Sequence, residues 1–310
     1  MSLEDVFKEF QEEKKEEIKK ELKEKLVEQP VIEEAVETIP EIETKVEVEE
    51  TKKDKLSEVF SEEEKEEPTF TFSEIKEDVE SDKEIHLIYG DKGKGKTTLA
   101  FGYPGEIVCL SFDNKSAKIK ATMYNNDKRI HIFNVTKYLD YDNDEKLLES
   151  SVKTYEYIKA VLEHSRKLKP DWIVFDGAEI FSQICEWRMR YKHNLGAFAG
   201  VTNLNLWKER RMNIRKIHNL ALSIARKGII YTTFTTKDTI VIAGEIITQK
   251  DVPKWIDVLM FETDYVIHVD TEPGTFRQLA TVVTSKDKSF LKTGKVYDVT
   301  DKTLWEAIKS

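Results

Sequence analysis

From residue 85 onward, the chain alternates short apolar runs with longer amphipathic stretches. Short apolar runs predict buried strands, and apolar residues spaced three and four apart predict helices that cover those strands. The runs predict strands at Ile85–Tyr89, Ile107–Ser111, Ile130–Val135, Trp172–Phe175, Gly228–Thr235, Thr239–Ala243, Tyr265–Val269 and Gln278–Thr284. The amphipathic stretches predict helices at Thr97–Phe101, Glu145–Leu168, Ala178–Tyr191, Asn203–Arg226 and Trp255–Phe261. This alternation indicates an α/β fold with a mostly parallel central sheet flanked by helices, and with antiparallel additions near its C-terminal end.

Residues 1–84 follow a different pattern. Apolar positions recur with helical spacing over residues 3–27, so a helix is expected there, and Pro30 ends it. The segment holds 14 lysines against 31 acidic residues, a net charge of −17, and it contains no Gly, Trp or Tyr. Such a composition cannot bury enough apolar surface to form a packed domain. We therefore expect a largely disordered acidic head over residues 1–84 and a folded domain over residues 85–310.

The folded domain is basic, with 35 Lys and Arg residues against 28 acidic ones, a net charge of +7. Cys109 and Cys185 lie in apolar surroundings and are too few for a disulfide framework or a metal cage, which fits a reducing compartment. No stretch approaches the roughly 18 apolar residues of a membrane helix, and the N-terminal residues do not follow the signal-peptide pattern. We therefore expect a cytoplasmic protein without membrane contact.

The motif G-x-x-x-x-G-K-T lies directly between the first predicted strand and the first predicted helix, which is the context that a phosphate-binding loop requires. The residues expected to form the nucleotide site are Gly90, Asp91, Lys92, Gly93, Lys94, Gly95, Lys96, Thr97 and Thr98. Glycines allow backbone N–H groups to surround a phosphate, and the helix N-terminus favours an anion. Lys96 is expected to reach the β- and γ-phosphates of ATP, while the Thr97 hydroxyl is placed to ligate Mg²⁺.

Two carboxylates follow other predicted strands. Asp176 ends the apolar run that begins at Trp172, about where a nucleotide-bound Mg²⁺ needs an acidic ligand. The next residue is Gly177 rather than Glu, so a catalytic base has to come from elsewhere. Asp113 follows the second strand and is one candidate for that base. The alternative is that Asp113 and Asn114 only initiate a turn.

This order of motifs resembles the RecA-like ATPases, especially the compact nucleotide-binding proteins encoded by phages and other viruses. The resemblance covers about residues 85–308 and includes the Thr-rich run Tyr231–Thr236. It implies a RecA-like fold and Mg²⁺-dependent ATP hydrolysis in recombination, single-strand annealing or replication of viral or mobile-element DNA, in the host cytoplasm if the protein is viral. By the same resemblance, Asp113 matches the catalytic carboxylate, usually Glu, and Thr235 or Thr236 replaces a γ-phosphate-sensing Gln.

The resemblance also implies partners. Lys286 and Lys288 match a late strand whose basic residues reach the ATP site of a neighbouring subunit, which would make the active form a homo-oligomer; the alternative is two solvated lysines in a hairpin. Basic and aromatic residues over 187–216 and the stretch 236–253 are candidates for contact with single-stranded DNA. The acidic head could lie over this basic surface or bind a protein partner.

Other functions stay open at the level of sequence. A nucleotide-gated scaffold with little or no turnover is one alternative, because the side chain of Asp113 is short. A DNA-packaging motor and a small-molecule kinase are others, although the arginines cluster between Arg188 and Arg226 on predicted helices rather than in a mobile lid.

Overall fold

The computed structural model describes residues 83–242, 245–254, 259, 262–287 and 290–309, so the acidic head and its expected helix lie outside the described residues. The strands are β1 Glu84–Tyr89, β2 Ile107–Ser111, β3 Ile130–Asn134, β4 Trp172–Asp176, β5 Gly228–Thr233, β6 Thr235–Ile242, β7 Glu245–Pro253, β8 Tyr265–Thr271, β9 Gln278–Ser285 and β10 Val296–Asp298. The helices are α2 Lys96–Phe101, α3 Ser116–Met123, α4 Asp144–Ser165 with the 3-10 turn Arg166–Leu168, α5 Ala178–Lys192, α6 Leu204–Ile224 and α7 Leu304–Lys309.

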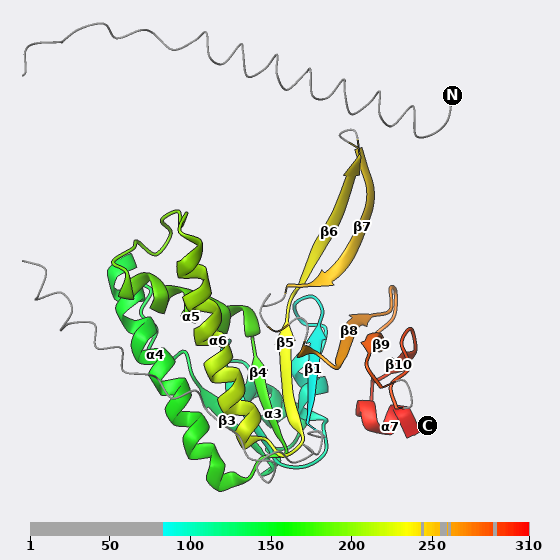
Figure 1. The fold of residues 1–310 in the computed structure, drawn as a ribbon. Helices are drawn as coiled ribbons and strands as arrows, with labels where there is room; N and C mark the ends of the chain where they lie inside the picture. Colours follow the sequence, from blue (N-terminus) through cyan, green and yellow to red (C-terminus); the bar gives the residue numbers. More distant parts are fainter. Residues whose placement is uncertain (1–82, 243–244, 255–258, 260–261, 288–289, 310) are drawn as a thin grey trace, which may run out of the picture. The chain divides into compact units, whose positions relative to one another are not determined.

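Eight of the described strands form one sheet in the order β10-β9-β8-β1-β5-β4-β2-β3 (Figure 1). The strands from β8 to β3 are mutually parallel, whereas β9 is antiparallel to β8 and β10 is antiparallel to β9. Helices α4, α5 and α6 pack on one face of the sheet, and α2 and α7 pack on the other. The predicted α/β fold, with a mostly parallel sheet flanked by helices and antiparallel strands at one end, is confirmed.

Both faces of the sheet are buried. In β4, the side chains of Ile173 and Phe175 join the core under α4, α5 and α6, whereas those of Trp172 and Val174 join the core under α2 and α7. A strand covered on both sides has no solvent-facing positions, so its sequence reads as a continuous apolar run. This is why the central strands could be placed from the sequence to within about two residues.

The carboxyl ends of the parallel strands meet at one edge of the sheet. The glycine-rich loop follows β1, Asp176 ends β4, Asp113 comes two residues after β2, and Phe234 follows β5. Ligands of open parallel sheets bind at this edge. The topology therefore gathers segments that are far apart in the sequence around the glycine-rich loop.

Beyond β5 the structure departs from the predicted strands. The run expected at Gly228–Thr235 divides at Phe234, and β6 pairs with β7 as a separate two-stranded hairpin, from Thr235 opposite Pro253 to Ile242 opposite Glu245. Figure 1 shows this hairpin projecting from the carboxyl edge of the sheet. The helix expected at residues 255–261 lies almost entirely outside the described residues. None of the helices in the described ranges is both long enough and apolar enough to cross a membrane.

Candidate functional site

The glycine-rich loop connects β1 to α2, and its glycines are needed for geometry. Gly93 and Gly95 have φ angles of 83° and 87°, in the left-handed region that other residues avoid. Gly90 has an ordinary φ but lies against β8, where an added Cβ would come within 2.2 Å of the carbonyl oxygen of Val269. The loop is therefore fixed both by its own turns and by the neighbouring strand.

Lys96 is the first residue of α2, and its side chain turns back over the loop. The Nζ atom donates hydrogen bonds to the carbonyl oxygens of Gly90 and Asp91, both at 2.9 Å, and lies 4.3 Å from the ring centre of Phe234. Burial lowers the pKa of Lys96, and Glu179 is the strongest of the carboxylates that oppose this shift. The ammonium group is thus held at the loop among acceptors that a phosphate oxygen could replace.

Asp176 lies beneath Thr97 at the end of β4 and is almost fully buried. Thr97 Oγ1 donates to its carboxylate, 2.8 Å from Oδ1 and 3.0 Å from Oδ2. Ser116 Oγ donates to Oδ2 at 2.7 Å and Thr232 Oγ1 donates to Oδ1 at 2.7 Å. Burial nevertheless raises the pKa of Asp176, because the hydrogen bonds from the hydroxyls of Thr232, Ser116 and Thr97 compensate the lost hydration only in part.

The pair of Thr97 and Asp176 fits a magnesium ion in its donor chemistry. Mg²⁺ takes oxygen ligands and is commonly held by one or two protein groups together with substrate phosphates and water. The Thr97 hydroxyl and the Asp176 carboxylate both offer oxygen atoms as metal ligands. They lie at hydrogen-bonding distance from each other, beside the loop that would hold the phosphates. The structure therefore brings the two expected metal ligands together.

Asp113 lies at the rim of the same site, but its carboxylate is engaged locally. The residue is exposed, and its Oδ1 accepts a hydrogen bond from the backbone N–H of Lys115 at 3.0 Å. Asn114 between them adopts a φ of 60°. This is the geometry of a side chain that stabilises its own turn, so the catalytic role expected for Asp113 stays a prediction.

The remaining residues of the loop divide into two groups. Lys92 and Thr98 line the cavity above the loop, and the carbonyl oxygen of Thr98 accepts a hydrogen bond from the Tyr124 hydroxyl. Lys94 points elsewhere, because its Nζ pairs with Asp270 at 2.9 Å. Asp91 is exposed and contributes its backbone carbonyl to Lys96.

Lys286 lies far from the loop of its own chain. It follows β9, whose last residue, Ser285, is opposite Tyr265 at the amino edge of the sheet, and its Nζ pairs with Asp264 at 2.9 Å. The site lies at the other edge, beyond Tyr89. A contribution of Lys286 to the site of a neighbouring subunit stays a prediction, and Lys288 lies outside the described residues.

Several side chains of the site were not expected from the sequence. They are Ser116, Glu179, Thr232, Thr233, Phe234 and Gln278. In the Thr-rich run, the resemblance points to Thr235 or Thr236, whereas in the structure Thr232 and Thr233 contact the acidic groups. For Glu179, the available signal was its position three residues after Asp176, where the first turn of α5 stays close to the strand end.

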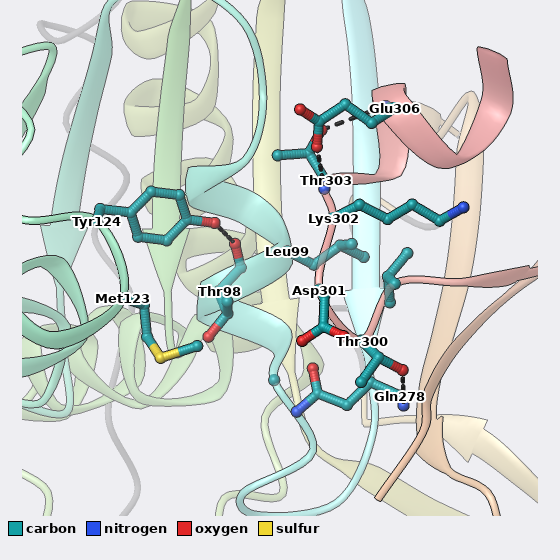
Figure 2. Close-up of a pocket in the computed structure, with 12 residues that line it drawn as sticks. Thr98, Leu99, Met123, Tyr124, Gln278, Thr300, Asp301, Lys302, Thr303 and Glu306 are labelled. Carbon is teal, nitrogen blue, oxygen red and sulfur yellow. Dashed lines mark hydrogen bonds between the residues drawn. The ribbon is translucent and has the colours of Figure 1, made fainter. Parts of the chain in front are cut away.

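These groups surround a cavity of about 480 Å³ above the loop. Its charged lining consists of Lys92, Lys96, Lys115, Lys118, Asp113, Asp176 and Glu179. A second hollow of about 280 Å³ lies next to it and shares Gly95, Thr98, Met123 and Gln278 with the cavity. In Figure 2, Tyr124 and Met123 lie on one side of α2, and Gln278 and Asp301 lie on the other.

No protein-family model matches the sequence, and no curated protein matches it. Among solved structures, the chain is similar to a KaiC-like protein from the hyperthermophilic archaeon Pyrococcus horikoshii OT3. The two chains are 15% identical with a TM-score of 0.38, and the match covers 69% of this chain and 84% of that chain. The chemistry of the site therefore rests on its own residues.

Proposed function

We propose that this chain is a RecA-like P-loop ATPase that binds ATP with Mg²⁺ and hydrolyses it. The observation that carries the proposal is the convergence of Lys96, Thr97 and Asp176, with Thr97 Oγ1 2.8 Å from Asp176 Oδ1, at the mouth of a cavity of about 480 Å³. A phosphate loop, a hydroxyl and a buried carboxylate at the carboxyl edge of a parallel sheet are the parts from which nucleotide hydrolases are built.

The charges of the cavity suit a polyphosphate. Its four lysines exceed its three carboxylates, and the loop backbone adds N–H donors around Gly93 and Gly95. Lys96 would exchange its two loop carbonyls for oxygens of the β- and γ-phosphates. When bound through Thr97 and Asp176, Mg²⁺ would neutralise charge that develops on the phosphate oxygens.

The second hollow is the place we propose for the nucleoside. It shares Gly95, Thr98 and Gln278 with the lining of the phosphate cavity, so the base and sugar of a nucleotide bound at the loop would lie next to it. Asp301 lines this hollow but not the phosphate cavity, and it is exposed. Replacing Asp301 with Trp should fill the hollow and weaken ATP binding about tenfold, a loss of about 1.4 kcal/mol.

Titration calorimetry with ATP and with inorganic triphosphate separates the two hollows. Asp301→Trp should leave the affinity for triphosphate unchanged, because the phosphate cavity keeps its lining. Equal losses for both ligands would mean that the substitution disturbs the loop, and an unchanged ATP affinity would place the nucleoside elsewhere.

We further propose that hydrolysis is coupled to single-stranded DNA, in recombination, annealing or replication of a virus or mobile element. Support comes from the carboxyl edge of the sheet, where the β6–β7 hairpin projects (Figure 1) and Lys237 and Lys250 are exposed. The segment after α5 exposes 78% of Phe198. The buried Arg190 holds this segment by donating to the carbonyl oxygens of Gly196 and Ala199 at 3.0 and 2.6 Å.

The deciding experiment is phosphate release by the full chain with Mg²⁺ and ATP, with and without single-stranded DNA, over a range of salt concentrations. We expect Mg²⁺-dependent turnover that DNA stimulates, and stimulation that weakens as salt rises because phosphate contacts release counterions. Turnover that ignores DNA would move the proposal toward a motor or a kinase. Tight ATP binding without turnover would favour the nucleotide-gated scaffold.

Phe198→Ala locates the DNA surface within the same experiment. Base stacking on an aromatic ring contributes about 1–3 kcal/mol, so DNA affinity should fall at least fivefold while turnover without DNA stays the same. Phe276→Ala is the matched control, since Phe276 is 95% exposed on the turn between β8 and β9. Equal losses for the two variants would contradict a DNA surface centred on Phe198.

A further inference from the structure

We propose that Glu179 is the catalytic carboxylate that accepts a proton from the water attacking the γ-phosphate, in place of Asp113. The assignment rests on the proposed ATP hydrolysis and adds the residue that the sequence left open.

Glu179 is placed by two elements that meet at the carboxyl edge. It lies in the first turn of α5, which begins directly after Asp176 and Gly177, and it lines the cavity above the glycine-rich loop. Its Oε2 lies 3.1 Å from Oγ1 of Thr233 at the end of β5. The hydroxyl donates either to Glu179 or to the carbonyl oxygen of Lys254. The carboxylate thus lies within hydrogen-bonding distance of a residue of β5, at the cavity where the phosphates would lie.

The electrostatic surroundings of Glu179 agree with this placement. Burial raises its pKa, and the hydrogen bond from its own backbone N–H, the Thr233 hydroxyl and the ammonium groups of Lys96 and Lys254 offset that effect only in part. Conversely, Glu179 opposes the lowering of the Lys96 pKa more strongly than Asp176, Asp91 or Asp113 does. Partial desolvation makes a carboxylate a stronger base than it is in water, and here the nearby ammonium of Lys96 offsets only part of that gain.

The other two carboxylates of the cavity are engaged. Asp176 accepts hydrogen bonds from the hydroxyls of Thr97, Ser116 and Thr232, which commits it to the metal side of the site. Asp113 is exposed, and its Oδ1 accepts the N–H of Lys115 within its own turn. Glu179 also lines the cavity; its carboxylate accepts its own backbone N–H and lies beside Lys96, and unlike Asp113 it is largely withdrawn from solvent while taking no part in the metal side of the site.

The step balances as an in-line displacement. A water O–H bond breaks and its proton goes to a Glu179 oxygen, while the water oxygen forms a new bond to the γ-phosphorus. The bond between the γ-phosphorus and the bridging oxygen breaks, and its electron pair leaves with ADP. Glu179 then releases the proton to solvent, and inorganic phosphate is the second product.

The test compares Glu179→Gln, Asp113→Asn and the wild type in the full chain. Gln keeps the size and the contact with Thr233 but cannot take up a proton, so phosphate release should fall about 100-fold or more. The affinity for ATP with Mg²⁺ should stay within threefold. Asp113→Asn should lose less than fivefold. Glu163→Gln, an exposed residue of α4 that pairs with Arg166 at 2.7 Å, controls for the loss of one surface carboxylate.

Each result decides one question. Phosphate release by Glu179→Gln within fivefold of the wild type overturns the assignment, and so does a 100-fold loss in Asp113→Asn alone. Circular dichroism of each variant shows whether a loss of phosphate release comes from unfolding. If Glu179→Gln unfolds, Glu179→Asp takes its place in the test, because a shortened base should retain partial turnover. A wild type that binds ATP but does not hydrolyse it overturns the proposed hydrolysis itself, and with it any catalytic base.

Discussion

Replacing Lys96 with Ala should reduce ATP hydrolysis by about a thousandfold and weaken ATP binding at least tenfold. The side chain is the ammonium group at the mouth of the loop, with Nζ 2.9 Å from the carbonyl oxygens of Gly90 and Asp91. Partial burial means that water screens its charge less than it would on the surface. A group with this placement binds phosphate in the ground state and stabilises further negative charge as the bond to ADP breaks.

The measurement is phosphate release together with calorimetric titration of ATP. Lys94→Ala is the comparison within the loop: its Nζ pairs with Asp270 at 2.9 Å, so hydrolysis should fall less than tenfold. Lys159→Ala, an exposed residue of α4 paired with Glu156, should behave as the wild type. Equal losses of hydrolysis in Lys94→Ala and Lys96→Ala would show that the total positive charge of the loop matters, and not the position of one ammonium group.

The central sheet could be predicted from sequence because its strands are buried on both faces. In β2 and β4, continuous apolar runs such as Ile107–Ser111 leave little choice of conformation or position. The glycine-rich loop was equally clear, since its spacing, its preceding strand and its following helix agree. The positions of the strands and of the loop together predict that Thr97 and Asp176 meet at the carboxyl edge of the sheet.

The elements at the margins were harder to predict for physical reasons. Helix α3 buries only Ser116 among its residues, so it has no apolar stripe, although that one buried hydroxyl binds Asp176. Strands β6 and β7 pair with each other rather than with the main sheet, and a two-stranded hairpin has no deep core to impose a pattern. Helix α7 has six residues, too few for periodicity to show.

Glu179 illustrates a different limit of sequence reasoning. A carboxylate three residues after a strand end is common in the first turn of a helix, where it also compensates the helix dipole. Only the position of Thr233 and Lys96 in space distinguishes Glu179 from such a residue. Asp113 had the better sequence argument, and its contact with Lys115 became visible only with the backbone of the turn.

Replacing Asp176 with Asn should lower Mg²⁺-dependent hydrolysis by a factor of about 100 or more and should raise the thermal stability of the protein measured without nucleotide and metal. Burial raises the pKa of Asp176 above that of an unfolded chain, so its charged form is less favourable in the fold than in water. Stability linked to this group is fully present below the unfolded pKa and is lost as the pH rises through the folded pKa. At neutral pH the wild type therefore carries a cost that Asn, an uncharged side chain that can still accept the hydroxyl of Thr97, does not.

Thermal unfolding of the two proteins over a series of pH values from 7 downward tests this sign. The advantage of Asp176→Asn should be largest at pH 7 and should shrink as the pH falls through the raised pKa of the wild-type carboxylate. Asp171→Asn is the matched control, because that buried carboxylate is paired with Arg226 at 3.0 Å and accepts the N–H of Glu106 at 2.9 Å. Removing its charge should lower stability, since it leaves a cation without its partner. If Asp176→Asn also lowered stability, the carboxylate and its three hydroxyls would be a cluster that stabilises the fold. The charge of Asp176 would then not be evidence for a metal ion at this site.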